Sequence, residues 1–293
     1  MSRGSPLSSL PVDPVNTVAS GAFYVFVTDG RTWGFASLLE SERHAPSAVR
    51  DGGTDSARFE AGTNPSLWAS ASGLVGYWSF DGTGSIANNQ IAGLRDESGR
   101  GNHGTASNAN ATGMAFVPGR VGNAVTFDGV DDFVSSPDSA TLGSIFGTEI
   151  FTLEAWAFPR DWVNWRSIIN KSNSGWHSAQ PAGLFADMDG FSVRIGQGID
   201  AGGQNVVAFM PAALNQWYHV VGVANGSILQ LYVNGVLRGS VAITMNPPTN
   251  NDPLMIGRFV GQLGSFNGLI DEVRIHNRAL TEAEIRATFN ATR

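Results

Sequence analysis

An oxygen-rich loop at residues 96–104, DESGRGNHG, carries the residue types that calcium binds in proteins. Calcium takes about six to eight oxygen ligands from carboxylates, side-chain amides and backbone carbonyls. Asp96, Ser98 and Asn102 offer such oxygens, and the glycines between them allow the backbone to turn its own oxygens inward. The alternative is an ordinary loop of Asx turns, in which these side chains accept backbone hydrogen bonds. Both interpretations stay open, because the acidic spacing of an EF-hand is absent from the sequence.

Aromatic residues suited to sugar binding follow in DWVNWRS and NSGWHS. The apolar C–H faces of a sugar stack on aromatic rings while neighbouring polar groups bond its hydroxyls. Trp162, Trp176 and His177 are therefore candidate ligand-binding residues. The alternative is that these rings pack in the core or at its rim, as we expect for Trp165 at the start of a strand.

The pattern of acids does not predict an enzyme. Retaining glycoside hydrolysis needs two carboxyls about 5–5.5 Å apart, and strand candidate 151–158 offers only Glu154. Asp187 and Asp189 have alternate spacing, but the glycine after them predicts a solvated turn. We expect a non-catalytic protein, with a glycan-active enzyme as the alternative.

Composition excludes several other classes of function. The net charge is −7 and Lys171 is the only lysine, so the basic surface of a nucleic-acid-binding protein is not expected. Cysteine is absent, which excludes disulfides and cysteine-ligated metals. No stretch reaches the roughly 20 apolar residues of a membrane span, and the N-terminus lacks the apolar core of a secretory signal. The chain is therefore cytoplasmic, or as given it begins downstream of an export segment.

The spacing of apolar residues predicts an all-β protein from residue 73 onward. Short strand candidates are separated by glycine-rich turns, and Asn234-Gly235 fits a type I′ hairpin turn. Eleven strands are expected, at 74–80, 124–127, 151–158, 166–170, 191–195, 206–210, 217–223, 229–233, 236–241, 254–257 and 268–275. This pattern favours a two-sheet antiparallel jelly-roll sandwich.

One helix is expected, at the C-terminal end. Thr281 and Glu284 have capping-box spacing, and Leu280 is placed to pack against Ile285 in the first turn. The preceding residues, 268–275, read as the last strand of the sandwich. Ahead of the sandwich, two apolar runs around Asp29-Gly30 predict a small hairpin unit at 1–43, and a polar, small-residue-rich segment at 44–72 predicts a linker.

Seven motifs from residue 73 onward resemble laminin-G-like jelly rolls, which belong to the concanavalin A-like lectin/glucanase fold. They are GLVGYWSFDGT, RDESGRGNHGT, GRVGNAVTFDGVDDFV, FTLEAWAFP, NQWYHVVGV, LQLYVNGV and LIDEVRIHNRALTEAEI, in the order seen in that family. The resemblance implies a domain at 73–293 that binds carbohydrate or protein and often holds calcium. It also implies a calcium site near Asp96, Asn102 and Asp271, with Asp81 as a fourth ligand.

The N-terminal unit resembles part of a type II secretion pseudopilin or type IV pilin-like protein, on the residues LPVDPVN, the aromatic hairpin and ASLLES. That resemblance implies pilus or pseudopilus subunits as partners and a place outside the cell or at its surface. The favoured hypothesis is a calcium-supported adhesion module for glycan or surface protein. A purely structural decoration of a pilus is a further alternative.

Overall fold

The computed structural model describes the chain in segments. They are residues 24–28, 33–38, 58–62, 73–87, 90, 92–107, 113–163, 166–171, 180–187, 189–196, 205–244, 249–259 and 264–293. For the first three segments only the backbone is described. No helix within these segments is long and apolar enough to cross a membrane.

The first three strands form a small antiparallel sheet of their own. β1 (Tyr24–Thr28) and β2 (Trp33–Leu38) form the hairpin predicted around Asp29-Gly30, with Thr28 paired to Trp33. β3 (Arg58–Gly62) pairs with β2, so this strand falls inside the segment at 44–72 that the sequence suggested as a linker.

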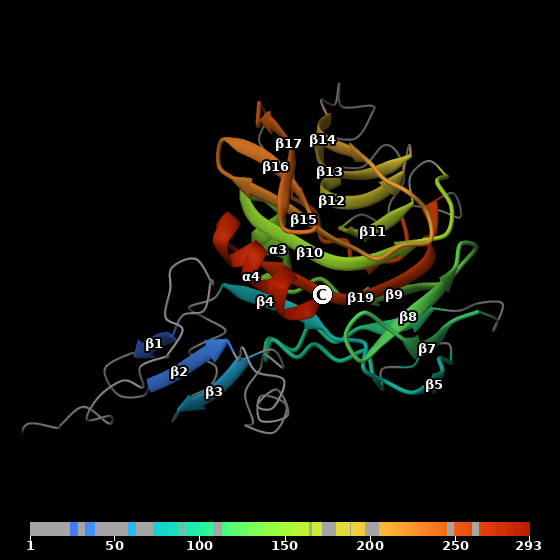
Figure 1. The fold of residues 1–293 in the computed structure, drawn as a ribbon, viewed down its shortest axis with the longest axis horizontal. Helices are drawn as coiled ribbons and strands as arrows, with labels where there is room; N and C mark the ends of the chain where they lie inside the picture. Colours follow the sequence, from blue (N-terminus) through green and yellow to red (C-terminus); the bar gives the residue numbers. More distant parts are fainter. Residues whose placement is uncertain are drawn as a thin grey trace, which may run out of the picture.

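The remaining strands form the two facing sheets of a sandwich (Figure 1). The nine-stranded sheet runs β17-β16-β15-β10-β19-β8-β7-β5, and β4 also pairs with β19. Its strands are β4 (Leu74–Trp78), β5 (Gly84–Ser85), β7 (Ala115–Pro118), β8 (Asn123–Asp128), β10 (Ile150–Pro159), β15 (Tyr218–Asn225), β16 (Ile228–Val233), β17 (Val236–Ala242) and β19 (Asn267–His276).

The seven-stranded sheet runs β14-β13-β12-β11-β18-β9-β6, and each neighbouring pair in this order is antiparallel. Its strands are β6 (Thr105–Ser107), β9 (Phe133–Ser136), β11 (Ser167–Asn170), β12 (Gln180–Asp187), β13 (Gly190–Gly196), β14 (Asn205–Pro211) and β18 (Leu254–Ile256). The all-β sandwich predicted from the sequence is therefore confirmed. β5, β6, β7, β9 and β12 and the short helix α3 (Ala140–Phe146) were not predicted.

The core lies between the two sheets and draws side chains from both. In β10, Leu153, Ala155 and Ala157 point into it, while the alternate residues Glu154 and Trp156 point to the outer face of the nine-stranded sheet. Both outer residues are almost fully buried, so this strand is covered on both faces.

Helix α4 (Glu282–Thr292) covers part of that outer face. Its capping box is present, because Thr281 accepts from the Glu284 N–H and Glu284 accepts from the Thr281 N–H. Leu280 and Ile285 lie in one apolar cluster, as the sequence predicted, and the cluster also contains residues of β15 and β16. At the far end of the helix, Phe289 stacks on Trp156 with ring centroids 5.8 Å apart.

A bulge in β19 decides which way its acids point. Arg274 pairs with Glu154 but Asp271 pairs with Trp156, so β19 contains one residue more than β10 over this stretch. Glu272 takes up the difference with a φ of 53° in the left-handed region. The bulge changes the alternation of the strand, so that Asp271 leaves the core face and Ile270 enters it.

Candidate functional site

The predicted oxygen-rich loop is held together by its own side chains. Asp96 Oδ1 accepts hydrogen bonds from the N–H groups of Tyr77 (3.0 Å) and Ser98 (2.9 Å). Asp96 Oδ2 accepts from the N–H of Asn102 (2.8 Å). Because the buried carboxylate already accepts three backbone hydrogen bonds, its main effect is to fix the loop, as in the Asx-turn alternative.

Asn102 is equally occupied. Its Nδ2 donates to Val75 O (2.7 Å) and to Thr141 Oγ1 (3.1 Å), while its Oδ1 accepts from Ser139 Oγ (2.7 Å). The side chain therefore joins the loop to β4 and to the start of α3. A metal at this position would have to displace bonds that already stabilise the fold.

Asp271 and Asp81 lie on either side of the turn at 119–123. Asp271 Oδ2 accepts from the N–H groups of Arg120 (2.8 Å) and Val121 (2.9 Å), and Asp81 Oδ1 accepts from the N–H of Asn123 (2.8 Å). Asp271 Oδ1 is buried without a hydrogen-bond partner in the described part of the chain. Burial, reinforced by the charge of Glu272, raises the pKa of the Asp271 carboxyl to about 8.

The predicted calcium ligands therefore fall into two pairs, Asp96 with Asn102 and Asp271 with Asp81. Within the described segments, one group of three acidic or histidine side chains has ligand atoms within 4.8 Å of one another, and it contains none of these residues. The calcium site stays a prediction, and Asp271 is the member of the set with a free buried oxygen.

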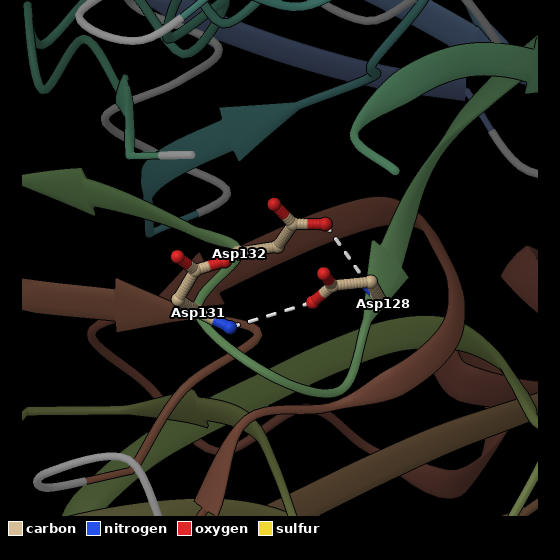
Figure 2. Close-up of side chains that lie close together, drawn as sticks. All are labelled: Asp128, Asp131 and Asp132. Atoms are coloured by element: carbon tan, nitrogen blue, oxygen red, sulfur yellow. Dashed lines mark hydrogen bonds between the residues drawn. The ribbon is translucent and has the colours of Figure 1, made fainter. Parts of the chain in front are cut away.

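That group of three is Asp128, Asp131 and Asp132, at the turn between β8 and β9 (Figure 2). Asp132 Oδ2 accepts from the Asp128 N–H (3.0 Å), and Asp128 Oδ1 accepts from the N–H groups of Val130 (2.8 Å) and Asp131 (3.4 Å). Burial, with the nearby charge of Asp128, raises the pKa of Asp132 to about 7. The run FDGVDD is the signal for this group in the sequence, and its acids are not among the predicted ligands.

Arg166 joins this turn to two other loops. Its guanidinium binds both carboxylate oxygens of Asp161 (Nε to Oδ1 3.0 Å, Nη2 to Oδ2 2.8 Å). Its Nη1 donates to the carbonyls of Gly129 (2.7 Å) and Ser265. We call the described residues 129–132, 160–163, 166 and 264–266 the three-loop edge.

The three-loop edge presents apolar side chains beside its carboxylates. Val130 is 55% exposed and Val163 is 48% exposed. Trp162, predicted to bind sugar, is half-buried and packs edge-on against Phe191, with ring centroids 5.5 Å apart and planes at 87°. The other two candidates, Trp176 and His177, lie outside the described residues.

Glu154 belongs to a buried ionic network rather than to an open catalytic site. Its Oε1 lies 2.9 Å from His219 Nε2 and 3.6 Å from Arg274 Nη1. Burial opposes its ionisation, but the hydrogen bond and charge of His219, together with Arg274, outweigh burial and lower the pKa of Glu154 to about 2. Glu272 also bonds Arg274 and Tyr77. Glu154 and Glu272 are each 1% exposed, so neither can contact a polysaccharide in this structure.

The two-sheet antiparallel sandwich, with loops gathered at its edge, defines a lectin-like class of β domain. A family model described as the Concanavalin A-like lectin/glucanases superfamily matches residues 127–286, which is more than half of the chain. The chain belongs to this superfamily. A sequence search found no match among curated proteins.

Solved structures share the fold at low sequence identity. Domain 4 of AbnA, a GH43 extracellular arabinanase from Geobacillus stearothermophilus solved in complex with arabinotriose, aligns with a TM-score of 0.58 and 21% identity over 75% of this chain and 98% of that domain. The binding domain of Paraclostridial Mosquitocidal Protein 1 aligns at 0.55 and 19%, over 75% of this chain and 52% of that one. The binding domain of botulinum neurotoxin DC in complex with rat synaptotagmin II aligns at 0.56 and 12%, over 75% and 52%.

Proposed function

We propose that this protein is a non-catalytic binding module whose ligand is a carbohydrate and whose binding surface is the three-loop edge. One observation carries the proposal. Arg166 fixes three separate loops, and the exposed side chains of Val130 and Val163 lie on these loops. A surface fixed before binding loses little conformational freedom when the ligand arrives. Apolar side chains next to carboxylates suit a sugar, which presents C–H faces and hydroxyls together.

The similar structures support binding rather than catalysis. One is a domain of an arabinanase with arabinotriose bound, and others are toxin binding domains. A protein ligand is the second candidate, favoured by the synaptotagmin complex of one such domain. The burial of Glu154 and Glu272 argues against a glycan-active enzyme using these acids.

Calcium supports the module in this proposal, held by Asp271 and Asp81. A buried carboxylate oxygen without a hydrogen-bond partner fits a hard cation, which prefers such oxygens. Asp96 and Asn102, the other two predicted ligands, support this site from the adjoining loop, which their hydrogen bonds hold in place. Bound calcium would contribute a fixed positive charge next to Asp271 and Glu272.

Extracellular display is part of the same proposal, with pilus or pseudopilus subunits as further partners. It is supported by the motif resemblance of residues 1–43 alone, and the family match begins later, at residue 127. Two experiments would test this part independently of ligand binding. One is to read the DNA just upstream of the coding sequence, and the other is to fractionate cells that express the protein and find the fraction that contains it.

A glycan array that includes arabinan fragments, followed by titration calorimetry, tests the binding surface. Val130→Glu combined with Val163→Glu places charge on the three-loop edge, and we expect affinity to fall about tenfold or more. Val236→Glu is the control, because Val236 is 45% exposed on β17, an end strand of the nine-stranded sheet that lies three places from β10. Unchanged affinity in the double variant would place the ligand elsewhere.

A further inference from the structure

Lys171, the only lysine in the chain, is fully buried in a cage of oxygens. Its Nζ lies 2.8 Å from Asn250 O, 3.1 Å from Asn250 Oδ1 and 2.9 Å from Asp252 O. Asp138 Oδ1 lies 2.8 Å from the same nitrogen. Four oxygens from two separate connections, β9–α3 and β17–β18, therefore surround one positive charge.

The cage contains four oxygens, one more than the number of N–H groups on the ammonium. A lysine ammonium has three N–H donors, and the three oxygens of Asn250 and Asp252 accept all three hydrogen bonds. Asp138 Oδ1 lies as close to Nζ as any of the others, at 2.8 Å, and forms an ion pair with it. Its attraction to the ammonium is therefore that of one charge for another, as between a ligand oxygen and a metal ion.

The composition of the cage is also that of a metal site. Backbone carbonyls, an amide oxygen and a carboxylate are the oxygen types that calcium takes. A backbone contact also joins the cage to the end of β11, since Asn250 Nδ2 donates a hydrogen bond to the carbonyl of Lys171 (3.1 Å), the residue that follows this strand. Removing the ammonium would take away the positive charge that these four oxygens share.

We propose that this cage is a cation site which the chain fills with its own lysine, and that the same oxygens bind calcium once the ammonium is removed. The edge formed by Asp138, Asn250 and Asp252 then keeps its shape without metal in the wild-type protein. Any calcium response of the wild type comes from another place, such as Asp271.

Lys171→Ala tests the proposal, because it removes the ammonium and opens space for an ion. We expect a lower melting temperature than in wild type, recovered in large part by calcium chloride but not by an equal ionic strength of sodium chloride. Calorimetry should show one more calcium per chain than wild type binds. One carboxylate and neutral oxygens predict a dissociation constant on the order of 10⁻⁴–10⁻³ M.

Two controls assign the gained ion to the cage. Lys171→Met fills the space without charge, so it should lose stability without recovering it in calcium. Adding Asp138→Asn to Lys171→Ala should remove the gained site, whereas adding Asp271→Asn should leave it in place. A Lys171→Ala protein that gains no calcium, or stays unfolded both with and without calcium, would overturn the proposal, whatever the outcome at Asp271.

Discussion

Burial of the Asp271 carboxyl, together with the charge of the neighbouring Glu272, disfavours the ionisation of Asp271. Two backbone N–H groups stabilise one oxygen of Asp271, but the other has no hydrogen-bond partner in the described part of the chain. Protonation and folding stability are therefore coupled at this residue, and the calcium binding proposed above would be coupled to both.

That coupling predicts how stability depends on pH. The folded-state pKa of Asp271 is about 8, above the ordinary value of 3.8, so its contribution is fully present below the unfolded pKa and is lost as pH rises toward 8. In chelator, the free energy of unfolding should fall over this range by at most about 1.4 kcal/mol per pH unit from this group. Asp271→Asn should flatten the dependence in urea-unfolding curves.

Calcium supplies the second half of this experiment. If calcium binds Asp271, saturating calcium should raise the melting temperature of wild type most at pH 8, where the carboxylate is most often ionised, and should have no such effect on Asp271→Asn. Equal melting temperatures in calcium and in chelator at pH 8 would show that Asp271 holds no calcium.

Lys171 predicts a different chemical behaviour. Its Nζ is buried and donates three hydrogen bonds, so the folded chain should present no reactive lysine to an amine-acylating reagent. After a short pulse of reagent, mass spectrometry should find the label on the α-amino group in native buffer and on Lys171 only in denaturant. Labelling of Lys171 at equal rates in both conditions would contradict the cage.

At the scale of elements, α4 depends on its first turn. Thr281 Oγ1 accepts from the Glu284 N–H (3.3 Å), and Glu284 also binds Arg278 (2.7 Å). Thr281→Ala removes the cap and should lower the free energy of unfolding by about 1 kcal/mol, measured in urea. Thr288→Ala, in the middle of the same helix, is the control and should change stability less. An equal loss in both variants would mean that capping is not what stabilises α4 here.

The elements that the sequence predicted well are those with a local cause. The capping box of α4 and the Asn234-Gly235 turn each depend on neighbouring residues, and both are present, with φ of 54° and 73° at the two turn residues. These features follow from side-chain chemistry within a few residues of one another.

The bulge in β19 could not be predicted in the same way. Strict alternation from Ile275 through Val273 would put Asp271 in the core. One extra residue at Glu272 reverses the alternation, and its cause is pairing with β10, which is over a hundred residues away in sequence. The acids of FDGVDD were missed for a related reason, since what brings Asp132 beside Asp128 is the turn between two strands, one of which (β9) was not predicted.

At the scale of the whole molecule, Arg166 connects the two sheets. The loops that it joins lie between β8 and β9, between β10 and β11, and between β18 and β19, and in each case one strand belongs to each sheet. A single guanidinium, with five donors in a fixed plane, thus holds three crossings of the sandwich together. The geometry of the proposed binding surface and the joining of the sheets therefore depend on the same residue.

Arg166→Ala should consequently change stability and binding together. Loss of hydrogen bonds to a charged group that is 9% exposed should lower the free energy of unfolding by on the order of 2–3 kcal/mol, measured in urea. The three loops would then no longer be fixed before binding, so glycan affinity, measured by calorimetry under conditions where the variant is folded, should fall as well. Arg160→Ala is the matched control for the stability measurement only, because Arg160 belongs to the same edge but is exposed, with one 3.5 Å side-chain bond to Thr126. A folded Arg166→Ala protein with wild-type affinity would show that the ligand does not bind at the three-loop edge.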